Sequence, residues 1–445
     1  MDISLTSNKL NNTIEAETFD DFALKPVQIT QKRSAFQIAI VTAGYCMTTS
    51  SLFTGAAISA GLSLFQAIVA ALIGNTLLAI YSGLIGAASA KHGVSTTMLA
   101  RHAFGRSGAK VVSALCATTL IGWYAVQTGL FGETLHAAAP SLGMLTSPKI
   151  AALWGGILMM LTAYIGYRGL EMLSKIAIPA LIFLAIWGIL ATVNQTTDGW
   201  AALFAANPNQ TFSLREGIVL VVGSFAVGAV VQADISRYAK DQKAAWIASI
   251  VGYIFANSFM IVAGVITSLA TGSGDLPAAM VSVGLSFPSL IILITAQWTT
   301  NDNNLYSASL ALSNILKIKK SIIVLICGVL ASFLGFFGII NYFIPWLNTL
   351  GILIPPIAGV MIADYYIIHK GNYQFGNGTE YSKIVWPAFI AWITGIMTGY
   401  LFPIGIPSIT AIVATFVTHI FLMQGCKKFS ISTKFGIAIE DKSGF

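Results

Sequence analysis

Twelve apolar stretches, each long enough to cross a lipid bilayer, constrain this chain more than any other feature of its sequence. A membrane-spanning helix needs about 20 mostly apolar residues. Only 9% of the residues are charged, whereas soluble domains carry about 25%. The sequence therefore predicts an all-α polytopic membrane protein with twelve transmembrane helices. The twelve stretches lie at residues 35–60, 64–90, 107–137, 150–168, 172–195, 214–236, 243–271, 279–312, 321–339, 342–368, 383–403 and 407–425.

Lysine and arginine are distributed unevenly between the two sides that these stretches define. With the N-terminus placed inside, 22 of the 24 fall on the inner side, and Lys149 and Arg215 fall on the outer side. Such a bias marks the cytoplasmic face of a membrane protein. We therefore expect an inner-membrane protein with cytoplasmic tails at residues 1–34 and 426–445. This placement also explains the net charge of +7 without a nucleic acid partner.

The sequence contains no familiar motif for enzyme chemistry. The four cysteines form no CxxC pair, and no HExxH, GxSxG or Walker sequence occurs. We therefore expect no enzymatic activity and no cofactor apart from a coupling ion. A transporter and a channel are the two remaining membrane classes, and substrate accumulation above the external concentration would separate them.

Two stretches place small and hydroxyl residues in the middle of the membrane. The first reads TAGYCMTTSS at 42–51 and continues to FTG at 53–55, and the sixth reads GSFAVGA at 223–229. Their spacing of five segments is typical of inverted-repeat transporters, in which the first helix of each repeat is unwound around the substrate site. The alternative is close helix packing through small residues.

Two other stretches carry side chains that are unusual at membrane depth. The eighth stretch contains WTTNDNN at 298–304, so Asp302 must face protein or water, either as a functional group or as a hydrogen-bonding staple between helices. The third stretch carries Trp123 in its middle, where a tryptophan serves either core packing or stacking on a flat ligand. The residues alone leave both questions open.

Six short motifs, in order along the chain, resemble those of the nucleobase:cation symporter (purine-cytosine permease) family, and most closely its bacterial cytosine permease branch. They are FTG at 53–55, MLARHAFG at 98–105, GWY at 122–124, VVGSF at 221–225 with AD at 233–234, WTTNDN at 298–303, and IPP at 354–356 with IADY at 362–365.

The resemblance implies a LeuT-type fold of two inverted five-helix repeats with discontinuous first and sixth helices. The transporter domain would span residues 35–425, with repeat one at about 35–195, repeat two at about 214–368 and two extra helices at 383–425. The resemblance also implies uptake of a planar heterocycle, usually with sodium. We expect the protein to act as a monomer.

The resemblance also assigns residues to a substrate site and a cation site. In the family the base is sandwiched between two aromatic rings, which match Trp123 and Phe225. The further substrate contacts that we predict are Ser50, Leu120, Val227, Gly228 and Asn301. The sodium ligands would be backbone carbonyls of Gly44, Met47 and Ala296 and the hydroxyls of Thr299 and Thr300.

Three positions depart from the cytosine-type pattern. Leu120 stands where a glutamine is usual, Val227 where a serine is usual, and Ala296 where an asparagine occurs. Because two polar readers of the base edge are missing, we expect cytosine to be a poor substrate. The sequence predicts sodium symport of a nucleobase or related heterocycle. The alternative is proton-coupled uptake of a nucleoside, an allantoin-like compound or a hydroxymethylpyrimidine-type vitamin precursor, with Asp302 or Asp234 as the proton carrier.

Overall fold

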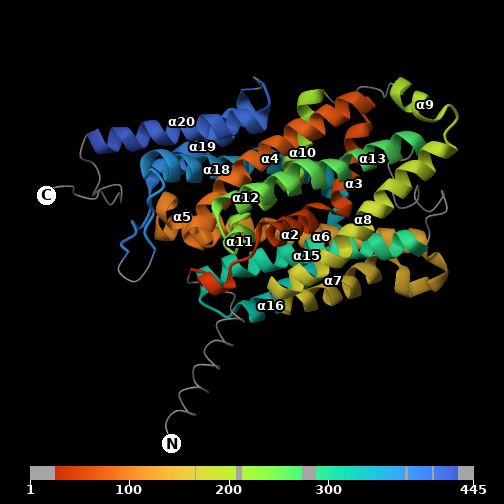
Figure 1. Cartoon of the computed structure of the whole chain (residues 1–445), viewed down its shortest axis with the longest axis horizontal. Helices are drawn as coiled ribbons and strands as arrows, with labels where there is room; N and C mark the ends of the chain where they lie inside the picture. The colour runs from red at the N-terminus through yellow and green to blue at the C-terminus, as the bar shows by residue number, and fades with distance from the viewer. Residues whose placement is uncertain are drawn as a thin grey trace, which may run out of the picture.

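The computed structural model describes residues 26–165, 167–206, 213–272, 287–375, 379–402 and 405–428. Within these ranges the regular secondary structure is helical, and the long helices pack side by side (Figure 1). Each of the twelve predicted stretches coincides with a helix or a run of helices, except that residue 166, residues 279–286 and residue 403 of these stretches lie outside the described residues. In chain order these are α2 (Ala35–Cys46) with α3 (Thr49–Ser59), α4 (Leu64–His92), α6 (Arg106–Ala138), α7 (Pro148–Ile165), α8 (Tyr167–Gln195), α10 (Leu214–Val230) with α11 (Ala233–Ser236), α12 (Gln242–Ser249) with η3 (Ile250–Asn257) and α13 (Ser258–Thr271), α15 (Phe287–Leu316), α16 (Lys320–Phe336), α17 (Phe343–Leu353) with α18 (Pro355–Ile362) and η5 (Ala363–Ile368), α19 (Trp386–Leu401), and α20 (Pro407–Lys428).

Shorter helices join these long ones. They are η1 (Ile29–Gln31), α5 (Thr96–Phe104), η2 (Pro140–Thr146), α9 (Gly199–Ala205) and η4 (Ile339–Tyr342). In the described part of the chain, seven helices or helix runs are long and apolar enough to cross a membrane, and the bent pair α2 and α3 makes an eighth. The fold is therefore an all-α membrane fold, as the apolar stretches predicted.

Burial orders the helices from the centre of the bundle to its edge. The most apolar window of α10 and α11 is completely buried, whereas the corresponding window of α20 is 22% buried. Helices α19 and α20 pack on each other at one edge, and α7 and α16 pack on each other at the opposite edge (Figure 1). The sixth predicted span therefore lies at the centre of the molecule.

The first predicted span is broken, with a bend of 51° between α2 and α3. Met47 (φ −81°, ψ 86°) and Thr48 (φ −132°, ψ 153°) leave the helical region and form the break. Gly44 lies within the last turn of α2, so the break falls three residues after the glycine. The carbonyl groups near the end of α2 consequently lose their helical partners and can serve other ligands.

The sixth predicted span is distorted at two points. Phe225 has φ −134° and ψ 17° inside α10, which is outside the helical region. The helix then ends at Val230, and α11 begins at Ala233. Both of the spans that were predicted to be discontinuous therefore depart from regular helix, the first by a sharp bend and the sixth by a kink and a short interruption.

Candidate functional site

A small cavity lies where the first, third, sixth and eighth spans meet. Its volume is about 10 Å³, enough for about one water molecule. Spans from both halves of the chain contribute to it, and the interruption after α2 and the kink in α10 are both at its wall. The residues that line the cavity are Tyr45, Ser50, Trp123, Gln127, Ser224, Phe225, Val227, Gly228, Thr300 and Asn304.

The two aromatic rings predicted to hold the substrate both reach this cavity. Trp123 is 4% exposed, and its Nε1 has no hydrogen-bond partner among the described residues. Phe225 is equally buried, and its ring meets the Tyr45 ring edge-on at 5.4 Å. Phe225 is both the residue at which α10 is kinked and a residue that lines the cavity.

Gln127 is a polar cavity residue that the sequence analysis did not select. Its Nε2 donates to Ser50 Oγ at 3.2 Å and also to Thr48 Oγ1. Its Oε1 is buried and accepts no hydrogen bond within the described structure. A buried acceptor without a partner costs about 1–3 kcal/mol, so this oxygen is ready to accept a hydrogen bond from a ligand.

Asn304 is the second polar side chain that the sequence analysis missed. Tyr45 Oη donates to Asn304 Oδ1 at 3.1 Å, and both residues line the cavity. The spacing in the sequence could have indicated both residues, because Gln127 lies one helical turn after Trp123 and Asn304 lies one turn after Thr300. Side chains four residues apart share a helix face.

The structure brings together most of the predicted substrate residues. Ser50, Val227 and Gly228 line the cavity with the two aromatic rings. Leu120 is fully buried but is not part of the lining. Asn301 faces a different neighbour, because its Nδ2 donates to Met159 Sδ of α7 at 3.2 Å. Among the asparagines of the eighth span, Asn304 rather than Asn301 therefore reaches the cavity.

Three of the predicted cation ligands, Gly44, Thr299 and Thr300, lie where the end of α2 contacts α15. Thr299 Oγ1 donates to the Gly44 carbonyl at 3.1 Å, and Thr300 Oγ1 donates to the Tyr45 carbonyl at 3.3 Å. Met47 is the first residue of the break, and Ala296 lies in α15 one turn before Thr300. Carbonyl and hydroxyl oxygens are hard ligands that suit a small cation, so these residue types fit the predicted site.

The two aspartates considered as proton carriers lie outside the cavity lining. Asp302 faces α7, where Thr162 Oγ1 donates to its Oδ1 at 2.5 Å, and Trp298 Nε1 donates to the same hydroxyl at 2.6 Å. Asp234 Oδ1 accepts from the Thr96 amide of α5 at 2.8 Å. Asp302 thus makes the contacts of a staple between α15 and α7.

Comparison with known proteins identifies the family. Residues 27–426 match the family described as permeases for cytosine/purines, uracil, thiamine and allantoin. The chain belongs to this permease family. It is 32% identical over 403 residues to the cytosine permease of Escherichia coli strain K12, covering 91% of this chain and 94% of that one. The protein is therefore a multi-pass membrane permease and not an enzyme, as the motifs implied.

Three further proteins resemble the permease in sequence or in fold. It is 24% identical to the hydantoin permease of Microbacterium maritypicum, over 88% of this chain and 84% of that one. Its structure resembles the nucleobase-cation-symport-1 transporter Mhp1 in a closed conformation with bromovinylhydantoin bound, with a TM-score of 0.82 at 19% sequence identity, covering 94% of this chain and 97% of that one. A sodium-coupled sialic acid symporter shares the fold more distantly, with a TM-score of 0.65 over 91% of each chain at 13% identity. The fold is thus the LeuT-type inverted repeat that the motifs implied.

Proposed function

We propose that this permease imports a nucleobase or a related planar heterocycle by sodium symport across the inner membrane, with both termini in the cytoplasm. The observation that carries the proposal is the buried cavity in which Trp123 and Phe225 stand beside the unpartnered oxygen of Gln127. A planar base offers two aromatic faces and an edge with N–H groups, and this lining is complementary to both.

The aromatic rings select for a flat ligand. Neither Trp123 nor Phe225 stacks face-to-face on a protein ring, since their ring contacts with Phe343 and Tyr45 are edge-on. A base could therefore stack on either ring without displacing a stacked protein ring, and stacking of a base on an aromatic side chain is worth about 1–3 kcal/mol. The cavity must widen for a base to enter, because it is now the size of a water molecule.

The polar groups select for a neutral ligand with a hydrogen-bonding edge. None of the ten residues that line the cavity is charged at neutral pH. A buried ionic ligand without a counter-charge would be strongly disfavoured. An N–H or amino group of the ligand would donate to Gln127 Oε1 of α6. The Asn304 amide of α15 also lines the cavity and would contact another polar atom of the ligand. The expectation that cytosine is a poor substrate stays a prediction. Leu120 and Val227 lack the usual polar groups, but the buried Gln127 Oε1 offers another acceptor to the edge of a base.

Sodium coupling is supported by the direct link between the cation residues and the cavity. Thr300 lines the cavity and donates to the Tyr45 carbonyl, while the Tyr45 side chain lines the same cavity. A sodium ion held by Gly44, Met47, Ala296, Thr299 and Thr300 would fix the end of α2 against α15. It would thereby fix one wall of the substrate site, so ligand and ion must raise each other's affinity by the same factor.

We also propose the domain organisation on the basis of the fold. Residues 35–425 would form one transporter domain with repeats at about 35–195 and 214–368, and the helices at 383–425 would be additions at the edge. The peripheral packing of α19 and α20 supports this division. We propose that one chain is the transporting unit, because the cavity is built entirely within one chain.

A binding screen of the purified permease tests the proposed function. Thermal stabilisation would be measured with cytosine, uracil, hypoxanthine, allantoin and hydantoin, each with and without sodium at constant ionic strength. We expect one planar compound to stabilise the protein, with a larger effect in sodium. Trp123→Ala should lose this stabilisation, whereas Trp187→Ala should retain it because that side chain is half exposed on the outside of the bundle. Equal stabilisation in the two variants would refute the stacking site.

A further inference from the structure

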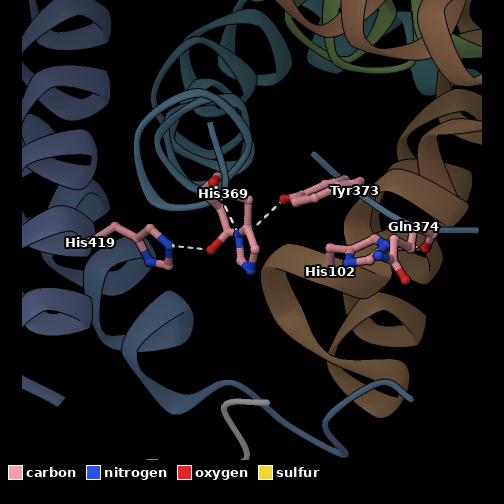
Figure 2. Close-up of polar contacts among 6 residues, drawn as sticks. His102, His369, Tyr373, Gln374 and His419 are labelled. Atoms are coloured by element: carbon pink, nitrogen blue, oxygen red, sulfur yellow. Dashed lines mark hydrogen bonds and ion pairs between the residues drawn. The ribbon is translucent and has the colours of Figure 1, made fainter. Parts of the chain in front are cut away.

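A buried carboxylate with three hydrogen-bond donors lies away from the substrate cavity, at the end of the tenth span. Asp364 of η5 accepts from His419 Nε2 at 3.1 Å on one oxygen, and from His369 Nδ1 at 3.0 Å and Tyr373 Oη at 2.5 Å on the other. Figure 2 shows His419 and Tyr373 on opposite sides of His369. We call these four residues the Asp364 cluster.

The Asp364 cluster joins parts of the chain that are far apart in sequence. His419 belongs to α20, whereas Tyr373 follows η5 in a loop. The Tyr373 ring stacks on His102 of α5 at 3.9 Å, with 16° between the ring planes (Figure 2). His102 Nε2 also contacts the Gln374 carbonyl at 2.9 Å. The cluster therefore ties the end of the tenth span to the twelfth span and to the link between the second and third spans.

The loop after η5 is also attached to the second span. Lys91 Nζ donates to the Gly371 carbonyl at 2.8 Å, and His92 Nε2 contacts Tyr365 Oη at 3.1 Å. Within the loop, the amides of His369, Gly371 and Asn372 are all hydrogen-bonded to backbone carbonyls. This loop is thus held from two sides, by the contacts of the Asp364 cluster and by these bonds to the second span.

His369 is the member of the cluster that can respond to the surrounding solution. Its side chain is 32% exposed, whereas those of Asp364 and His419 are buried. His102 of α5 is a poor sensor, because burial lowers its pKa to about 4. The charged and titratable groups around His369 are Asp364, Tyr373, Arg101, His102, Glu380, Tyr381, His419 and Lys427.

The charge state of His369 changes with pH in a defined direction. Burial opposes its positive charge, yet the hydrogen bond and the negative charge of Asp364 outweigh burial and raise the pKa of His369. The ion pair therefore contributes fully below the pKa of a free histidine, about 6.5. It is lost as the pH rises through the raised pKa of the folded state. Acidification strengthens the contact.

We propose that the Asp364 cluster is a proton-sensitive latch, in which protonation of His369 by an acidic cytoplasm tightens the end of the tenth span and slows transport. The tenth span is coupled to the cavity through one neighbouring helix, since α17 and α18 pack against α10, which carries the cavity residue Phe225. A stiffer end of this span opposes the rearrangement that widens the cavity. The inference goes beyond the proposed substrate and ion, and it uses the proposed orientation with this end inside.

Hydrogen exchange of the purified, full-length permease tests the latch without any substrate. After correction for intrinsic exchange, the amides of 369–372 should exchange about two- to fivefold more slowly at pH 6 than at pH 8, as expected for a partly exposed ion pair. His369→Gln keeps a donor for Asp364 but cannot become charged, so its exchange should be independent of pH. The matched variant His136→Gln, on an exposed side chain far along α6, should behave as the parent.

Uptake into right-side-out vesicles tests the effect on transport. With external pH fixed, a transported nucleobase should enter the parent about two- to fivefold more slowly at internal pH 6 than at internal pH 8. This dependence should be absent in His369→Gln and present in His136→Gln. The latch is overturned if His369→Gln keeps the pH dependence of the parent in either measurement. Failure of every nucleobase to bind would refute the proposed function, while the exchange result would still decide the latch.

Discussion

At the scale of single residues, an unpartnered polar atom is the most informative feature of the site. Gln127 is fully buried with its amide nitrogen held by Thr48 and Ser50, so the side chain cannot rotate freely to find another donor for its oxygen. The position of the oxygen is set before a ligand binds. This preorganisation reduces the entropy lost on binding.

Replacement of Gln127 by leucine should weaken ligand binding strongly. A ligand N–H that enters the variant would lose its water and gain no acceptor, at a cost of about 1–3 kcal/mol. We therefore expect the Kd to rise by about 5- to 150-fold. Isothermal titration would measure it. Gln195→Leu, at the exposed end of α8, is the matched control and should leave the Kd unchanged.

Thr300→Val should uncouple ligand binding from sodium. The change keeps the shape of the side chain and removes the hydroxyl that meets the Tyr45 carbonyl at 3.3 Å. We expect the increase in ligand affinity caused by sodium, about 5- to 150-fold for coupling of this kind, to be largely lost. The sodium-free affinity should change less, although Thr300 also lines the cavity. Thr394→Val removes a hydroxyl bonded within its own helix, α19, and serves as the control. A full sodium response in Thr300→Val would place the ion elsewhere or make the proton the coupling ion.

The residue types were predictable, but their directions were not. A run of asparagines in the eighth span indicated a functional stretch, and the stretch does contact both the cavity and α2. Asn301 and Asn304 are three residues apart, which is about 60° around the helix, and this small offset decides that Asn304 lines the cavity while Asn301 contacts Met159. Sequence alone gives the period of a helix but not the direction that each face takes.

At the scale of helices, glycine serves one of the two roles considered from the sequence, which is close packing between helices. Gly223 of α10 lies so close to α17 that a Cβ would be 2.0 Å from the Leu347 carbonyl oxygen. Gly55 of α3 and Gly264 of α13 allow an equally close approach, since a Cβ on either would lie within 2.1 Å of a backbone oxygen of the other helix. Gly55 and Gly223 therefore serve packing. The break in the first span lies at Met47 and Thr48, and the kink in the sixth lies at Phe225.

Gly223→Ala should destabilise the permease. The added methyl group would meet backbone rather than a flexible side chain, so α10 and α17 would have to move apart. Overpacking of this kind costs about 1–3 kcal/mol, and the melting temperature in detergent should fall. Gly425→Ala in α20 has no atom within 4 Å of the new Cβ and should leave the melting temperature equal or higher. An unchanged melting temperature in Gly223→Ala would show that the helices tolerate separation.

At the scale of the whole molecule, composition determined the architecture, while contacts between distant spans had to come from the structure. The apolar stretches correctly predicted the helical spans because the bilayer fixes their length and polarity. The same reasoning cannot reveal which spans touch. The Asp364 cluster, for example, joins residues 50 or more positions apart, and its histidines looked like ordinary loop and helix residues in the sequence.

A second contact between distant spans lies near the start of α2 and joins Lys32, Arg237 and Tyr306. Arg237, just after α11, is fully buried and donates through Nη2 to Tyr306 Oη of α15 at 2.7 Å. Lys32 Nζ donates to the Arg237 carbonyl at 2.8 Å, so the segment before α2 joins the same contact. The end of the sixth span and the eighth span are therefore linked by a charge-assisted hydrogen bond.

Tyr306→Phe should loosen this end of the permease while leaving the fold intact. The variant keeps the ring that lies 4.7 Å from Lys320 Nζ and removes the hydroxyl that holds Arg237. A hydrogen bond to a charged group contributes about 1.5–3 kcal/mol, so the population in which the sixth and eighth spans separate should grow by about 10- to 150-fold. Hydrogen exchange at residues 231–240 should accelerate accordingly. Tyr342→Phe, on an exposed side chain before α17, is the control. If residues 231–240 exchange at the parental rate in Tyr306→Phe, then Arg237 is held by its other contacts, and the link between the two spans does not govern opening at this end.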